Sequence, residues 1–153
     1  MNSTRGRVDP LWNADDEIVF VRQEGRRRKG NLFLMNPAGG QVRRVTGRRR
    51  QRWFVPVDWS ADADRLLTTE FRRQRRPRSV VFDLSTGRKW PVRQRRMKGF
   101  LGTALSADGG LVLGSSGKAD PLAKHLVGTV PATGGGSMHV LGEFAYEPDW
   151  SPR

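Results

Sequence analysis

A motif that recurs at nearly constant spacing constrains the fold of this chain more than any other feature. Residues 9–20 read DPLWNADDEIVF, residues 57–71 read VDWSADADRLLTTEF, and residues 103–113 read TALSADGGLVL. A fourth beginning, EPDWS, occupies residues 147–151. The equivalent anchor positions, separated by 45–47 residues, are Trp12, Trp59, Leu105 and Trp150. Self-similarity at such a period is typical of repeat architectures, in which each repeat is one supersecondary unit.

Each repeat contains four short apolar segments separated by turn signals. In the second repeat the segments are PVDW, RLLTTEF, SVVFDL and KWPV. Runs of this length, rich in Val, Leu, Phe and Thr and bounded by Gly, Pro, Asn and Asp, indicate strands joined by hairpins. Four strands in about 45 residues is the period of propeller blades. The sequence therefore predicts an all-β protein, a β-propeller of about three four-stranded blades at residues 8–54, 55–100 and 101–146, with the opening strand of a fourth at 147–153.

Two stretches, DPLWNADDEIVF and GNLFLMNPAGGQVRRVT, resemble the repeats of the TolB-type, WD-repeat-like β-propeller family. Those repeats carry a W-S-P-D-G turn, an apolar strand, a Gly-Gly turn and a closing R-R-L-T. The resemblance covers three repeats and the DWSP of residues 149–152. It departs at Ala61 and Ala107, which replace Pro, at Asp16, which replaces Gly, and at Leu105, which replaces Trp. The resemblance implies a non-catalytic propeller that serves as a protein-interaction platform.

The anchors and the turns that follow them have structural roles in this interpretation. Each anchor ends the first strand of its blade and is expected to pack in the core between neighbouring blades rather than to contact a cofactor. Ser and Asp in the following turn are expected to hydrogen-bond the nearby backbone. No cofactor is predicted.

Three blades and a fraction of a fourth do not close a ring, because propellers close with four to eight blades. The chain is therefore either a fragment of a longer propeller or a unit that pairs with a second copy to give six blades. We favour the fragment, because residues 147–153 begin another motif. In both cases other blades, from a longer chain or from self-pairing, are expected partners, since an open strand edge otherwise invites aggregation.

The charge of the chain is strongly positive, with 28 Lys and Arg against 15 Asp and Glu, a formal net charge of +13. Such a charge favours polyanionic or acidic protein partners. The positive residues concentrate in the loops between second and third strands and between blades, which open on one face, whereas the opposite turns are slightly negative in sum. The predicted basic face consists of Arg26, Arg27, Arg28, Lys29, Arg48, Arg49, Arg50, Arg52, Arg72, Arg73, Arg75, Arg76, Arg78, Arg93, Arg95, Arg96 and Lys98.

Residue patterns that carry catalysis or bind metal are missing from the sequence. There is no cysteine, and the two histidines, His125 and His139, fall on different predicted elements without metal-ligand spacing. No G-x-S-x-G elbow occurs, and GSSGKA at residues 114–119 does not meet the phosphate-loop pattern. A tight surface turn explains the acidic residues 15–17 without acid–base chemistry. The expectation is that this chain is not an enzyme and has no catalytic or metal site.

Three functions remain open. The leading one is the interaction platform, with Trp53, between Arg52 and Phe54, either contacting the partner or packing between blades. The first alternative is the accessory propeller of a prolyl-oligopeptidase-type serine peptidase whose catalytic domain lies outside this chain. The second is weak, non-specific nucleic-acid binding. There is no apolar run of about 18 residues and no signal peptide, so a cytoplasmic location without a membrane span is expected, provided that Met1 is the native start.

Overall fold

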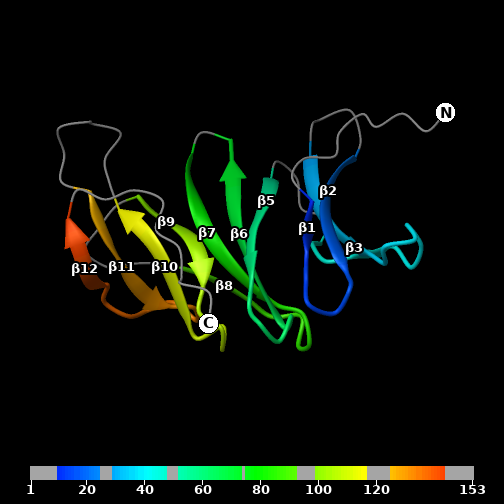
Figure 1. The fold of residues 1–153 in the computed structure, drawn as a ribbon. Helices are drawn as coiled ribbons and strands as arrows, with labels where there is room; N and C mark the ends of the chain where they lie inside the picture. Colours follow the sequence, from blue (N-terminus) through cyan, green and yellow to red (C-terminus); the bar gives the residue numbers. More distant parts are fainter. Residues whose placement is uncertain are drawn as a thin grey trace.

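The computed structural model describes residues 10–24, 29–47, 52–73, 75–92, 99–116 and 125–143. Within these ranges every regular element is a β-strand, and there is no helix (Figure 1). The predicted all-β class is confirmed. In the described part of the chain no helix is long and apolar enough to cross a membrane.

Twelve described strands form three successive antiparallel meanders of four strands each. The first meander contains β1 (Leu11–Trp12), β2 (Ile18–Glu24), β3 (Lys29–Met35) and β4 (Arg43–Arg44). The second contains β5 (Arg52–Trp59), β6 (Arg65–Arg72), β7 (Arg75–Asp83) and β8 (Lys89–Pro91). The third contains β9 (Phe100–Leu105), β10 (Leu111–Ser116), β11 (Leu126–Pro131) and β12 (His139–Glu143).

The three meanders lie side by side in sequence order (Figure 1). One parallel residue pair, Gly30 with Trp53, joins β3 to β5, so the first two meanders share a mixed sheet. The expected boundary between residues 54 and 55 falls inside β5, which pairs with β6 from Arg52 onward.

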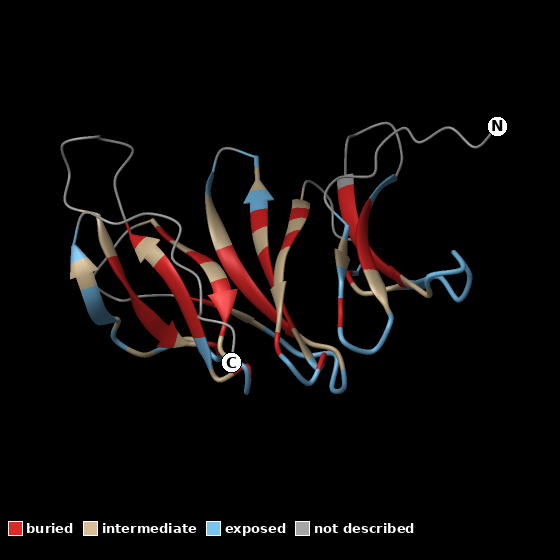
Figure 2. Ribbon diagram, in the orientation of Figure 1, coloured by how far each residue is buried: buried red, intermediate tan, exposed pale blue. Residues whose placement is uncertain are grey.

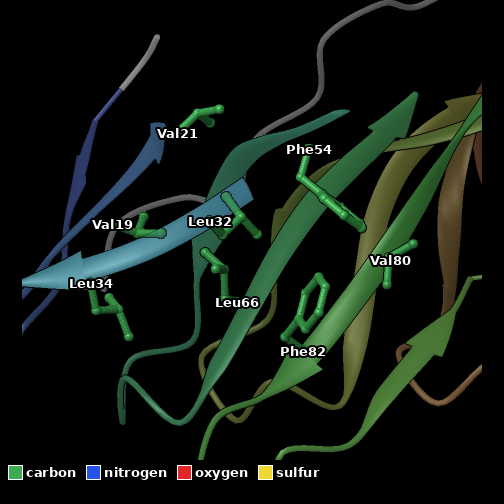
Figure 3. Packing of buried hydrophobic residues seen from close by; sticks show 8 residues of the cluster. All are labelled: Val19, Val21, Leu32, Leu34, Phe54, Leu66, Val80 and Phe82. Atoms are coloured by element: carbon green, nitrogen blue, oxygen red, sulfur yellow. The ribbon is translucent and has the colours of Figure 1, made fainter. Parts of the chain in front are cut away.

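Hydrophobic cores fill the spaces between neighbouring meanders. Both faces of β6 are apolar because Leu66 packs toward the first meander and the adjacent Leu67 packs toward the third. Consecutive buried residues therefore occur at 66–68 in β6 and at 79–82 in β7 (Figure 2). The core between the first and second meanders comprises Val19, Val21, Leu32, Leu34, Phe54, Leu66, Val80 and Phe82 (Figure 3). The core between the second and third comprises Leu67, Val81, Val92, Phe100, Leu105, Val112, Val130 and Ala132.

The turn after each anchor has the same backbone shape in all three meanders. The fourth residue after each anchor has a positive φ, which is 57° at Asp16, 58° at Ala63 and 64° at Gly109. Glycine reaches this conformation without strain, whereas a residue with a Cβ pays about 1 kcal/mol for it. The sequence departure from Gly at Asp16 is therefore accommodated by the turn without a change in its course.

The anchors occupy equivalent positions, at the ends of β1, β5 and β9. Leu105 is buried in the second core, and Trp59 packs against the first core. The expectation of core packing is wrong for Trp12, whose side chain is 58% exposed. Trp59 and Leu105 both face the preceding meander, and among the described residues no meander precedes the first. Trp150 lies outside the described residues.

The arginine-rich stretch that was expected to form a basic loop at residues 72–78 is mostly strand. Strand β6 continues to Arg72 and β7 begins at Arg75, so the two strands are joined by a tight hairpin. The extension of both strands brings Arg72 and Arg78 to the carboxylate of Glu70, which offsets part of their positive charge.

Candidate functional site

The predicted basic face lies only partly within the described residues. Arg52 begins β5. Five further arginines lie in the β6–β7 hairpin, and they are Arg72, Arg73, Arg75, Arg76 and Arg78. The backbone of Lys29 begins β3. The remaining members lie outside the described residues, and they are Arg26, Arg27, Arg28, Arg48, Arg49, Arg50, Arg93, Arg95, Arg96 and Lys98.

Three of these arginines converge on one buried carboxylate. Glu70, near the end of β6, has a side chain that is 1% exposed. Arg78 Nε donates to Glu70 Oε2 at 2.5 Å, and Arg72 Nη2 lies 3.0 Å from the same oxygen. Arg52 Nη1 forms an ion pair with Oε1 at 2.8 Å, although its alignment is poor for a hydrogen bond. Strand pairing sets this up, because Glu70 lies opposite Phe54 on β5 and opposite Arg78 on β7.

Burial and the arginines act in opposite directions on Glu70. Burial by itself raises the pKa of its carboxyl group, because a charge is poorly solvated away from water. Hydrogen bonds from Arg72 and Arg78, together with the charges of Arg78 and Arg52, outweigh burial and hold the pKa below its ordinary value. Glu70 therefore stays ionised at neutral pH and neutralises part of the arginine charge. This compensation allows the arginine-rich residues to continue as strands.

The remaining described arginines of the hairpin, Arg73, Arg75 and Arg76, are exposed. Trp53 is half-buried and packs against the first core, where a Cβ on Gly30 would come within 2.7 Å of its ring. Trp53 thus contributes to the junction between β3 and β5. The described part of the basic face consequently divides into a Glu70-bound set and an exposed set at the tip of the hairpin.

Acidic residues in the turns at the opposite ends of the strands form hydrogen bonds within those turns. Ser60 Oγ donates to Asp62 at 2.5 Å, and Ser106 Oγ donates to Asp108 at 2.6 Å. These hydrogen bonds are the main cause that lowers the pKa of each of the two aspartates. In the first meander Asn13 Oδ1 accepts from the backbone N–H of Glu17 at 2.8 Å. Carboxyl groups with lowered pKa values do not fit a role as general acids at neutral pH.

The acids of the first turn also have partners on neighbouring strands and loops. Trp12 Nε1 donates to Asp16 Oδ1 at 3.2 Å, and Glu17 forms an exposed ion pair with Arg43 at 3.0 Å. Across the described ranges, no three His, Cys, Asp or Glu residues gather in a way that could hold a metal ion.

The propeller-type arrangement of the meanders is shared with solved structures of known proteins. No family model matches the chain, and no curated protein matches it. TolB from Acinetobacter baumannii is 16% identical, with a TM-score of 0.51 over 96% of this chain and 46% of TolB. The fold is of the TolB-like propeller type.

Peptidases are also similar in structure. A prolyl endopeptidase aligns with a TM-score of 0.64 and 13% identity, over 90% of this chain and 22% of the enzyme. A puromycin-hydrolyzing peptidase from Mycobacterium tuberculosis aligns with a TM-score of 0.61 and 20% identity, over 96% of this chain and 22% of the enzyme. The chain thus spans less than half of TolB and about a fifth of these peptidases. At such identities the similarity concerns the fold alone.

Proposed function

We propose that this chain is a β-propeller segment of about three blades, with the start of a fourth, that binds a partner rather than catalysing a reaction. Its partner is an anionic protein or another polyanion, bound on the basic face. The observation that supports this most directly is the β6–β7 hairpin, in which Glu70 holds Arg72 and Arg78 while Arg73, Arg75 and Arg76 stay exposed.

The hairpin is suited to such binding because its charge and its rigidity come from different residues. The Glu70 contacts fix the ends of β6 and β7 against β5. The exposed arginines at the tip are then presented from a fixed support, so less conformational entropy is lost on binding. Exposed guanidinium groups without a shaped pocket favour contacts with charge over readout of sequence, and such contacts weaken steeply with salt.

The test is a charge reversal on the hairpin with a matched control. In one variant Glu replaces Arg73, Arg75 and Arg76. In the other Glu replaces the exposed Arg43, Arg88 and Lys89, which lie at the strand ends opposite to the β6–β7 hairpin. Both variants have the same net charge. Binding to heparin, to single-stranded DNA and to an acidic peptide is measured by fluorescence anisotropy over a salt series.

We expect the hairpin variant to lose more affinity and to show a shallower dependence of log affinity on log salt, because fewer counterions are released. Equal losses from the two variants contradict the proposal. A preference for the acidic peptide identifies a protein partner, whereas equal binding to all three probes supports the weak nucleic-acid alternative.

A second candidate function is that of an accessory propeller in a prolyl-oligopeptidase-type serine peptidase. It is favoured by the TM-scores of 0.60 to 0.64 to two peptidase structures and two puromycin hydrolase structures, each covered over only 21–22% of its length. The experiment is to read the frame beyond residue 153 and to assay the full-length product on a prolyl-p-nitroanilide peptide. A G-x-S-x-G elbow together with activity that is lost on its Ser→Ala change supports this candidate. A reading frame without that elbow eliminates it.

A further inference from the structure

Phe71 is an exposed aromatic residue within the positively charged β6–β7 hairpin. Its side chain is 41% exposed, and it lies on β6 between Glu70 and Arg72. Glu70 and Arg72 form an ion pair, so their side chains share one face of the sheet. Because side chains alternate along a strand, Phe71 lies on the other face. The ring is therefore separate from the buried ion pairs and accessible to solvent.

The pairing of β6 with β7 is irregular at Phe71. The register shifts between positions 70 and 72, so Phe71 alone lies across from two residues of β7, Arg76 and Pro77. Such a bulge bends its strand and changes the direction of nearby side chains. Residues directly across an antiparallel pair have Cβ atoms about 5 Å apart. The guanidinium group of Arg76 is therefore close enough for it and the Phe71 ring to contact the same ligand.

The arginine side chains at the hairpin tip are accessible to a ligand. Arg73, Arg75 and Arg76 are exposed, and both strands are exposed near the tip (Figure 2). Within the described ranges these three side chains form no ion pair, because the carboxylate of Glu70 is held by the three other arginines of the site. Their charge is therefore not neutralised by a neighbouring acid.

Trp12 provides a contrast, since it is also an exposed aromatic residue but has acidic surroundings. Its indole Nε1 donates to Asp16, and the acidic residues 15–17 follow it in the turn. Of the large hydrophobic side chains that are exposed in the described ranges, only Trp12 and Phe71 are aromatic. The stretch 70–78 around Phe71 contains five arginines and one glutamate. Among the described residues, the Phe71 surface alone thus combines an exposed aromatic ring with positive charge.

We propose that the β6–β7 hairpin binds single-stranded nucleic acid, with a base stacked on Phe71 and the phosphates contacted by Arg73, Arg75 and Arg76. Bases stack on aromatic rings and on guanidinium planes, and phosphates pair with the arginine charge. The anionic groups of an acidic peptide or of heparin use the charge alone. In a duplex the bases stack on one another, so a single strand is the form that offers a free base. The inference rests on the proposed function and adds the chemical class of the partner.

The first experiment compares two probes that have the same charge and differ in their bases. A fluorescein-labelled oligothymidylate of about 12 nucleotides, within the site sizes of single-strand binders, is compared with an abasic phosphodiester of the same length. Binding of the full chain is measured by fluorescence anisotropy. Oligothymidylate should bind about fivefold more tightly or better, because stacking of one base contributes at least about that factor. An oligouridylate of the same length distinguishes RNA from DNA as the preferred strand.

The second experiment removes the ring without changing the charge. Phe71→Leu should weaken oligothymidylate binding by about fivefold or more and leave binding of the abasic probe unchanged, which also verifies that the hairpin is intact. The dependence of log affinity on log salt should stay the same, because no arginine is lost. Phe71→Trp should bind oligothymidylate at least as tightly as wild type.

Trp12→Leu is the matched control, because it removes an exposed aromatic ring from the acidic surface at the opposite strand ends. It should leave the binding of both probes unchanged. Far-UV circular dichroism verifies that each variant keeps its β structure.

Three results overturn the inference. Equal affinity of the wild type for the abasic probe and oligothymidylate means that only charge is recognised. If charge reversal of Arg73, Arg75 and Arg76 weakens both probes in that case, the proposed function stands and this inference alone fails. Weaker binding of Phe71→Leu to the acidic peptide, with oligothymidylate unaffected, means that the ring contacts a protein. Absence of binding to every anionic probe contradicts both the inference and the proposed function.

Discussion

Replacing Glu70 by Gln removes the charge that holds three arginines together while preserving the size of the side chain. Removing one partner of a buried ion pair costs about 3–5 kcal/mol, and exposed pairs contribute about 0–1 kcal/mol. The side chains of Arg52, Arg72 and Arg78 are 18%, 22% and 25% exposed, so water partly solvates them once the carboxylate is gone. We therefore expect a loss of about 2–3 kcal/mol in the free energy of unfolding.

The assay is thermal and urea unfolding followed by circular dichroism, with Glu17→Gln as the control. For a chain of this length each kcal/mol corresponds to about 3 °C, so the Tm of Glu70→Gln should fall by about 6–9 °C. Glu17 also pairs with an arginine, at 3.0 Å, but the pair is exposed, and its loss should cost about 0.5 kcal/mol or less.

The pH dependence of stability provides a second readout for Glu70. Because the folded-state pKa of Glu70 is lowered, its stabilisation is fully present above the ordinary glutamate pKa and is lost as pH falls through the folded-state value. The difference in stability between wild type and Glu70→Gln should therefore shrink in that acidic window. Equal stability of the two proteins at neutral pH would refute the reasoning, and so would a difference that does not shrink in acid.

Two further predictions concern the junctions and turns, and urea unfolding measures both. Ser79→Ala should lower the free energy of unfolding by about 1–3 kcal/mol, because the buried N–H of Gly102 donates to Ser79 Oγ at 2.7 Å and would lose its acceptor. An unchanged urea midpoint would contradict this prediction. Gly109→Ala should lower the free energy of unfolding more than Gly87→Ala. Both glycines have a positive φ, but only a Cβ at Gly109 would meet a neighbouring side chain, that of Arg65 at 2.7 Å. Backbone strain alone should lower the free energy of unfolding of each variant by at least about 1 kcal/mol. Equal losses in the two variants would show that the side chain of Arg65 moves aside without cost.

The strand order and the turns could be predicted from the sequence because they depend on local interactions. Gly, Asp and Ser at fixed offsets from Trp12, Trp59 and Leu105 end one strand and begin the next, and the apolar runs between them identify the buried segments. In the second repeat, β5, β6, β7 and β8 overlap the four segments predicted from the sequence. The basic face as a whole stays a prediction, because most of its residues lie outside the described ranges, and the sequence did not indicate that Glu70 holds Arg52, Arg72 and Arg78.

Tertiary structure alone decided what the charged and aromatic residues do. The composition of the stretch 72–78 predicts a solvated loop, whereas in the folded chain most of it is strand and Glu70 pairs with Arg52 from a different strand. Trp12 and Trp59 have similar local sequences but different exposure, because burial is set by whether another sheet lies opposite. The repeat period and the turn residues are fixed by the order of residues along the chain, so the sequence alone predicts the strands and turns. Charge compensation and burial depend on residues brought together by folding, so they appear only when the sheets are packed.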